Sequence, residues 1–172
     1  MERRFDMKTL QDYINESILD DEEVLVADTK KAVNNPYKLI KKWLFSAKDV
    51  DDLPDNFIGF IGEHVISRLR QIPFLKNKRI YAGVNHGYKN LRVDIEASVR
   101  GNSHLQILSI ICTSEGKLEV QLPFVSNKQL EKLNLYPDLF ALLEELKTEY
   151  GFQESTKPGT FAQKFKHYCV EL

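Results

Sequence analysis

Alternating apolar and polar residues mark the middle of the chain as a β-sheet. In LRVDIEASV (91–99), Val93, Ile95, Ala97 and Val99 fall on one face, and Asp94 and Glu96 fall on the other. This spacing is typical of a half-buried antiparallel strand. Three further strand-like runs cover 79–84, 105–113 and 117–122. The run 105–113 is apolar on both faces, so we expect it at the centre of the sheet. Short turns join the four runs, which predicts an antiparallel meander.

Apolar residues at helical spacing occur both before and after this predicted sheet. The pattern predicts helices over 9–19, from the acidic DDEE at 20–23 to Lys31, over 36–45, and over 57–72 up to Pro73. After the sheet it predicts a helix capped at Ser126, a break at Tyr136–Pro137, and a second helix ending at Gly151. The tail reads either as a helix or as a last strand, 167–172, pairing with 151–155. The Gly and Pro punctuation favours the strand.

These elements predict an α+β fold with one helical extension. We expect an N-terminal helical arm over 1–46, an acidic linker over 47–56, and an α+β domain over 57–172. The domain should hold an antiparallel meander sheet of four to six strands, with helices packed on one face. The linker is placed where the chain is polar, acidic and interrupted by Pro54.

Composition narrows the class of protein. No run of eighteen apolar residues is present, so no membrane span or membrane partner is expected. Polar residues interrupt every stretch that resembles the core of an export signal, so secretion by a signal peptide is not expected. Cys112 and Cys169 are the only cysteines and lack metal-ligand spacing, so we expect two buried thiols.

Four polar residues on neighbouring predicted strands are the candidates for catalysis. Asp94, followed later by Glu119-Val120-Gln121, resembles a weakened PD-(D/E)xK nuclease pattern, in which carboxylates hold Mg²⁺ and a lysine orients water. Glu96 is the fourth candidate. Gln121 stands where the lysine is usual, the Pro-Asp step is absent, and the meander order differs. The solvent-facing side of a half-buried antiparallel strand normally carries charged residues, so the same residues can be explained without a catalytic role.

A set of basic and aromatic residues raises a second alternative. Bases interleaved with rings suit single-stranded nucleic acid, because phosphates meet the charge and bases stack on the rings. The set comprises Lys76, Lys78, Arg79, Tyr81, Lys89, Arg92 and Arg100. Asp94 and Glu96 lie among these residues, so a solvated surface of mixed charge is the competing interpretation.

No other motif predicts a cofactor or a metal. The four histidines, at 64, 86, 104 and 167, have no His or Cys partner at ligand spacing. No P-loop, Gly-x-Gly-x-x-Gly or Gly-x-Ser-x-Gly sequence occurs. The sequence therefore favours a protein without an enzymatic site.

The segment Met7–Glu16, MKTLQDYINE, resembles the N-terminal capsid-targeting peptide of internal head proteins from large tailed phages. Those peptides begin with Met-Lys-Thr, form a short amphipathic helix, and end at a Leu/Ile-x-Glu site cut by the prohead protease. The resemblance implies processing between Glu16 and Ser17, packaging into the procapsid and, for some members, injection with the DNA to act on host defences.

Six residues, MERRFD, precede this segment, so Met1 and Met7 both remain candidate starts. Residues 57–172 carry no recognised family pattern. The combined prediction is a non-enzymatic phage protein, associated with the virion or interacting with the host, and located in the bacterial cytoplasm or the phage virion. It would have an N-terminal targeting arm and an α+β domain that binds a protein partner. A divergent Mg²⁺-dependent nuclease and a small single-stranded nucleic-acid-binding module are the alternatives.

Overall fold

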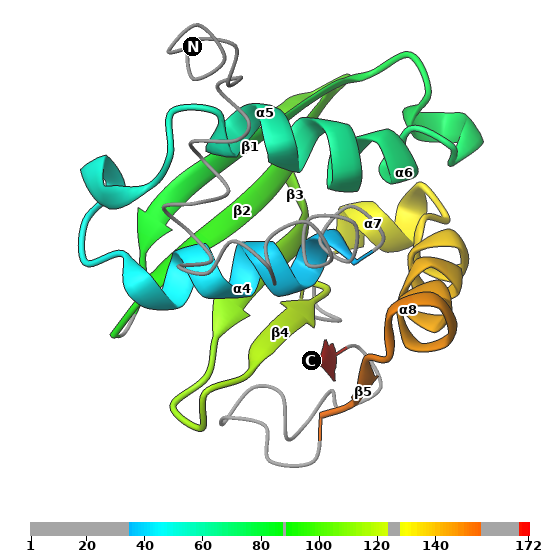
Figure 1. Cartoon of the computed structure of the whole chain (residues 1–172). Coiled ribbons are helices and arrows are strands. Elements are labelled where there is room, and N and C mark those ends of the chain that lie inside the picture. The colour runs from blue at the N-terminus through cyan, green and yellow to red at the C-terminus, as the bar shows by residue number, and fades with distance from the viewer. Residues whose placement is uncertain (1–34, 88, 124–127, 156–168) are drawn as a thin grey trace, which may run out of the picture. The chain divides into compact units, whose positions relative to one another are not determined.

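The computed structural model of the chain describes residues 35–87, 89–123, 128–155 and 169–172 (Figure 1). Residues 40–172 form one compact unit. The helices predicted before residue 34 and the cap predicted at Ser126 lie outside the described residues. None of the described helices is long and apolar enough to cross a membrane.

A six-stranded antiparallel sheet is the centre of the compact unit. Its strands are β1 (Arg79–His86), β2 (Leu91–Val99), β3 (Asn102–Cys112), β4 (Leu118–Gln121), β5 (Gln153–Glu154) and β6 (Cys169–Glu171). They lie in the order β1-β2-β3-β4-β6-β5, and every neighbouring pair is antiparallel. The predicted α+β fold with a four-stranded meander is confirmed, and the apolar run of β3 lies inside the sheet.

The last strand extends the meander through a second hairpin. β6 lies between β4 and β5, so the end of the chain pairs with both strands. This agrees with the strand interpretation of the tail. Gly151 ends the preceding helix and lets the chain turn into the hairpin. Its φ of +79° lies in the left-handed region that favours glycine. The backbone then turns so that Phe152 is buried and β5 begins.

The helices are α4 (Pro36–Ser46), α5 (Phe57–Ile61), η2 (Gly62–Ile66), α6 (Ser67–Leu69), α7 (Lys128–Lys132) and α8 (Tyr136–Tyr150). Two short 3₁₀ turns are η1 (Val50–Asp52) and η3 (Pro73–Leu75). The helix predicted over 57–72 ends at Leu69 and contains a π turn at η2, which the 3.6-residue period does not reveal. Pro73 starts η3, and Pro137 lies in the first turn of α8, where proline is tolerated.

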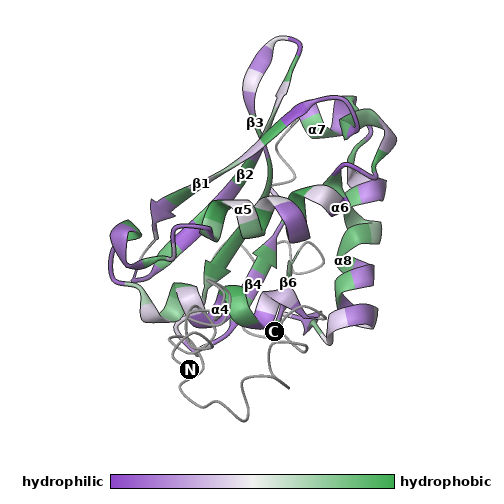
Figure 2. Ribbon diagram, turned by 45° about the horizontal axis from the view of Figure 1, so that its top comes forward, coloured by the Kyte–Doolittle hydropathy of each residue, from purple (hydrophilic) through white to green (hydrophobic). Residues whose placement is uncertain are grey.

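The core lies between the sheet and its helices. Val93, Ile95 and Ala97 of β2 have no exposed surface, whereas the residues between them are half-buried on the opposite face. α5 and η2 contact β1, and α8 contacts β6. Figures 1 and 2 show α4, α5 and α6 on one side of the sheet. The sheet therefore has one apolar face under the helices and one polar face.

The predicted acidic linker, residues 47–56, joins the helices α4 and α5, which contact each other. The ring of Trp43 in α4 packs edge-on against Phe57 and Phe60 of α5, with centroid distances of 5.7 and 5.0 Å. Asp49 and Asp52 form a capping box at η1 between them. The compact unit begins at Ile40, so residues 47–56 connect parts of this one unit.

Removing a side chain from the buried face of β2 should destabilise the fold. We expect Ile95→Ala to lower the free energy of unfolding by about 2–5 kcal/mol, because it leaves a cavity in a filled core. The matched change Ile58→Ala, at a residue that is 45% exposed, should alter it by less than about 0.5 kcal/mol. Urea unfolding followed by circular dichroism measures both, and equal losses would contradict the observed packing.

Candidate functional site

The polar face of the sheet gathers most of the residues predicted to have a function. Side chains alternate between the two faces along each strand. The odd-numbered residues of β1 and their register partners in β2 and β3 therefore share this face. Its polar side chains on these strands and on β4 are Arg79, Tyr81, Asn85, Arg92, Asp94, Glu96, His104, Gln106, Ser109, Glu119 and Gln121.

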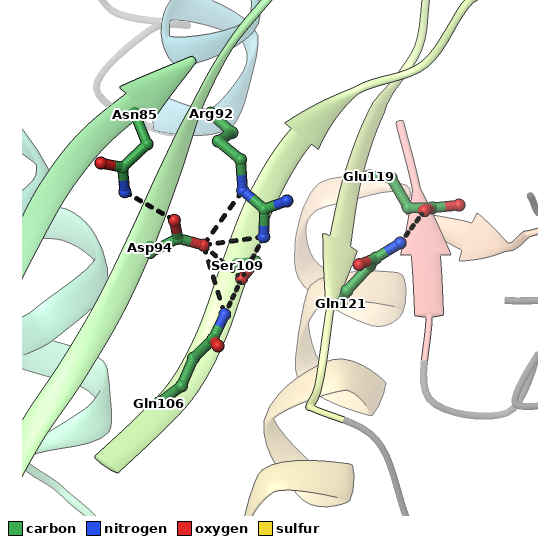
Figure 3. A network of polar contacts seen from close by, with 7 residues as sticks. All are labelled: Asn85, Arg92, Asp94, Gln106, Ser109, Glu119 and Gln121. Atoms are coloured by element: carbon green, nitrogen blue, oxygen red, sulfur yellow. Dashed lines mark hydrogen bonds and ion pairs between the residues drawn. The ribbon is translucent and has the colours of Figure 1, made fainter. Parts of the chain in front are cut away.

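Asp94 is the centre of a hydrogen-bond network on this face (Figure 3). Its Oδ1 accepts hydrogen bonds from Ser109 Oγ at 2.7 Å, Arg92 Nη2 at 2.8 Å and Gln106 Nε2 at 3.2 Å. Its Oδ2 accepts one from Asn85 Nδ2 at 2.7 Å. The donors come from β1, β2 and β3, so the network connects three strands through one carboxylate.

This environment keeps Asp94 ionised. Partial burial alone would raise the pKa of Asp94, but the hydrogen bonds from Ser109, Arg92 and Asn85, with the charge of Arg92, outweigh it. The pKa therefore lies below the ordinary value for an aspartate. A carboxylate with a lowered pKa and both oxygens engaged is a weak general base. To ligate a metal ion, it would first have to give up these partners.

Glu119 and Gln121, the other part of the predicted nuclease pattern, belong to a separate cluster. Gln121 Nε2 donates to Glu119 Oε1 at 2.7 Å, and the buried Ser155 hydroxyl donates to Glu119 Oε2 at 2.7 Å. Glu171 of β6 is the register partner of Glu119, and the two residues are only 4% and 3% exposed. Lys117 Nζ lies 3.0 Å from Glu171 Oε1 and offsets part of the charge of this pair.

The fold places β3 between the two halves of the predicted nuclease site. Asp94 pairs with Ser109, and Ser109 pairs with Gln121, so β2 and β4 are about 10 Å apart at ordinary strand spacing. Figure 3 shows the Glu119–Gln121 pair apart from the Asp94 network. No group of three potential metal ligands occurs among the described residues. The nuclease hypothesis thus gains no support from this geometry and stays a prediction.

Glu96, the last nuclease candidate, contributes to an exposed corner of the polar face. His104 Nδ1 lies 3.2 Å from Glu96 Oε1 and 2.6 Å from Tyr81 Oη. The guanidinium of Arg79 lies 5.6 Å from the centre of the Tyr81 ring, within cation–π range. The pKa of the Tyr81 phenol is raised, chiefly by desolvation and to a smaller extent by the hydrogen bond with Glu96. We call Arg79, Tyr81, Glu96 and His104 the aromatic corner.

The predicted nucleic-acid-binding set is divided between the two ends of the sheet. Arg79 pairs with Ser98 beside the β2–β3 turn, which holds Arg100, and Lys76 and Lys78 immediately precede β1. Lys89 lies at the opposite end, in the β1–β2 turn. Arg92 is near that end and forms an ion pair with Asp94. β1 is about 23 Å long, so the set does not form one continuous patch.

The two thiols of the described residues are not activated. Burial raises the pKa of Cys112 and of Cys169 to about 12, so both thiols are protonated at neutral pH. A hollow of about 260 Å³ lies between α8 and the β5–β6 hairpin, with Phe140, Leu143 and Val170 among its lining residues. It is slightly smaller than a typical small-molecule pocket.

Several residues of the polar face were not identified from the sequence. Ser109 carried a signal, because it is an isolated polar residue in the apolar run of β3. The two-residue spacing of Arg92 and Asp94 also places both on one face. Ser155 and Glu171 gave no comparable signal, since their partner Glu119 is distant in the sequence. Glu16 and Ser17, the predicted processing site, lie outside the described residues.

Neutralising Asp94 should show how much the network stabilises the fold. We expect Asp94→Asn to reduce the free energy of unfolding by about 1.5–3 kcal/mol at pH 7, because Arg92 loses its charged partner. The pKa of Asp94 is lowered by folding, so its contribution is present above the unfolded pKa and lost as pH falls through the folded pKa. The difference between variant and parent should therefore shrink in acid.

Urea unfolding between pH 7 and pH 3 measures this effect. Asp55→Asn is the control, because Asp55 is exposed and lies outside the network. A stability difference between parent and Asp94→Asn that stays constant over this range would contradict the role assigned to the carboxylate.

Comparisons with protein-family models, with curated proteins and with solved structures found no match to this chain.

Proposed function

We propose that this chain is a non-enzymatic phage protein, associated with the virion or interacting with the host, whose N-terminal arm targets it and whose α+β body binds a protein partner. One observation carries the proposal: the acidic side chains of the polar face are engaged by their neighbours. Asp94 accepts hydrogen bonds from four residues, and Glu119 accepts them from Gln121 and Ser155.

Such engagement favours a structural role for these carboxylates. General acid–base or metal-assisted catalysis needs a group that faces the substrate with an open coordination position or a suitable pKa. Asp94 has a lowered pKa and engaged oxygens, and Glu119 is almost completely buried. Protonated Cys112 and Cys169 are weak nucleophiles at neutral pH. These properties support binding rather than catalysis.

The aromatic corner is the part of the polar face best suited to protein contact. Tyrosine and arginine are enriched among residues that dominate binding energy. His104 has 72% of its side chain exposed, and its contacts with Tyr81 and Glu96 restrain the ring. Side chains that are already restrained lose less conformational entropy on binding than mobile ones. We therefore assign Arg79, Tyr81 and His104 to the partner-binding surface.

The N-terminal segment supports the targeting half of the proposal. Met7–Glu16 has the amphipathic spacing and the Ile-x-Glu ending of the capsid-targeting peptides that it resembles. An amphipathic helix can bind a scaffold through its apolar face. A single cut between Glu16 and Ser17 would then release the body from the scaffold.

Mass spectrometry of purified phage particles tests the proposal. We expect the protein in mature particles with Ser17 as its first residue, because the prohead protease would cut after Glu16. Glu16→Gln should leave the segment uncut, while Glu22→Gln, an acidic control downstream, should be processed normally. Absence of the protein from particles, or an intact N-terminus there, would contradict targeting and processing.

The enzymatic alternative has its own decisive measurement. Plasmid and single-stranded DNA are incubated with the purified chain in Mg²⁺ or Mn²⁺. The proposal predicts no cleavage above background. Metal-dependent cleavage that Asp94→Ala abolishes would replace the proposal with the nuclease hypothesis.

One observation favours single-stranded nucleic-acid binding as a second candidate. Lys76, Lys78, Arg79 and Arg100 lie at the same end of the sheet, next to the ring of Tyr81. Four phosphate contacts would make the logarithm of the binding constant fall with the logarithm of salt concentration at a slope of about −3.

Fluorescence anisotropy with a labelled single strand measures this slope. Arg79→Ala with Arg100→Ala should weaken binding and flatten the slope, whereas Lys89→Ala at the other end should change neither. Binding that is absent, or independent of salt, would remove this candidate.

A further inference from the structure

The outer edge of β1 offers unpaired backbone groups for another strand. β1 is the first strand in the sheet order, and no described strand pairs with its outer side. Gly87 N–H donates to Asn90 O at 2.8 Å, which makes these two a hydrogen-bonded pair at the hairpin turn. Antiparallel pairs alternate, so Asn85, Gly83 and Tyr81 bond to β2. The backbone groups of Ile80, Ala82, Val84 and His86 therefore point outward.

Among the described residues, this edge lacks several of the features that prevent strand addition. Proteins protect edges with short strands, proline, bulges or inward-pointing charges. The opposite edge, β5, is only two residues long. β1 is eight residues long, contains no proline, and pairs with β2 in unbroken register. Within the described residues, β1 can therefore act as a template for an additional strand.

Charge of opposite sign lies at the two ends of β1. Asp49 Oδ1 is 3.8 Å from His86 Nε2 at the C-terminal end, and Asp51 and Asp52 lie in the adjoining η1 turn. Lys48 and Lys89 lie at the same end, so its three acids exceed its two bases by one charge. The N-terminal end carries Lys76, Lys78 and Arg79, with Arg100 in the neighbouring turn. Arg70 Nη1 donates to Lys78 O there. The ends are about 23 Å apart, beyond the screening length at physiological salt, so each acts as a separate charged patch.

Apolar side chains accompany the edge. Ile58 and Val50 are the exposed large hydrophobic residues of the described chain, at 45% and 41%. Val50 follows Asp49, which contacts the end of β1. Ile58 belongs to α5, which packs on β1. Phe60 of α5 contacts Trp43 of α4. Ile58 is two residues earlier in the same helix, which is a rotation of about 200°, so it lies on the side of α5 away from α4.

We propose that the outer edge of β1 is a self-association surface, on which β1 of a second copy of this chain pairs antiparallel across a two-fold axis. Centred on Gly83, this pairing sets Ala82 opposite Val84 and Ile80 opposite His86, and adds about eight backbone hydrogen bonds. It also sets the acidic end of each copy against the basic end of the other, twice. A parallel or offset partner strand would lose this charge match.

A symmetric pair of this kind makes one continuous sheet and repeats the same patch on both copies. Ile58 and Val50 are exposed on elements next to β1, so any part of them that the second copy covers would remove apolar surface from water. Arg79 belongs both to the basic end of this contact and to the aromatic corner, so the two surfaces share this residue.

Analytical ultracentrifugation of the full chain tests the association. The 20.0 kDa chain should sediment as a dimer of about 40 kDa at micromolar concentrations. Ala82→Pro removes an outward N–H without touching a β1–β2 hydrogen bond, and the loss occurs twice in the dimer. We expect at least about tenfold weaker association. Ala82→Ser, which keeps the N–H, should behave as the parent.

A charge-exchange experiment checks the orientation without relying on proline. Lys76→Glu, Lys78→Glu and Arg100→Glu together leave Arg79 as the one base of the N-terminal set, so both ends of β1 become acidic. Asp49→Lys with Asp51→Lys makes both ends basic. Each variant alone should be monomeric, because like charges meet at both contacts. An equimolar mixture should form the dimer again, because opposite charges then meet twice; this rescue also shows that both variants fold.

A parent chain that is monomeric at about 100 μM would overturn the proposal. A dimer that both Ala82→Pro and the charge variants leave intact would overturn it equally, since association would then use another surface.

Discussion

Burial of one face of the sheet under the helices is the interaction on which the other features depend. In β2, Val93, Ile95 and Ala97 are fully buried, and α5, η2 and α8 cover the strands on this side. Because side chains alternate along a strand, this burial also decides which residues occupy the opposite face. Arg92, Asp94 and Glu96 therefore share the polar face.

The polar face has its own physical requirement. A half-buried charge is costly unless hydrogen bonds or an opposite charge compensate it. Asp94 meets this requirement through four neighbours, and the opposed pair Glu119 and Glu171 meets it through Gln121, Ser155 and Lys117. Compensation of this kind stabilises the carboxylates in their buried or half-buried positions. The aromatic corner is more open, since the side chain of His104 is largely exposed.

The edges of the sheet add a second constraint. On one side, β6 pairs with β4 and is followed only by the two-residue strand β5, so little unpaired backbone remains. On the other side, the eight-residue strand β1 has an outer edge with which no described strand pairs. Oppositely charged ends make that edge complementary to a copy of itself. A protein that binds one partner through its polar face and a second copy through its edge would present two binding surfaces in one assembly.

Local pattern was sufficient for most of the secondary structure, because periodicity and turn chemistry act over a few residues. Alternation predicted β2 and its polar face, and Gly151 predicted the end of α8. The π turn at η2 escaped prediction, since it departs from the period used to identify helices. Strand order and register were decided only by the tertiary structure. β3 separates Asp94 from Glu119, and the chain end brings Glu171 beside Glu119 and Ser155. These contacts join residues far apart in the sequence, and only packing of the whole sheet selects them.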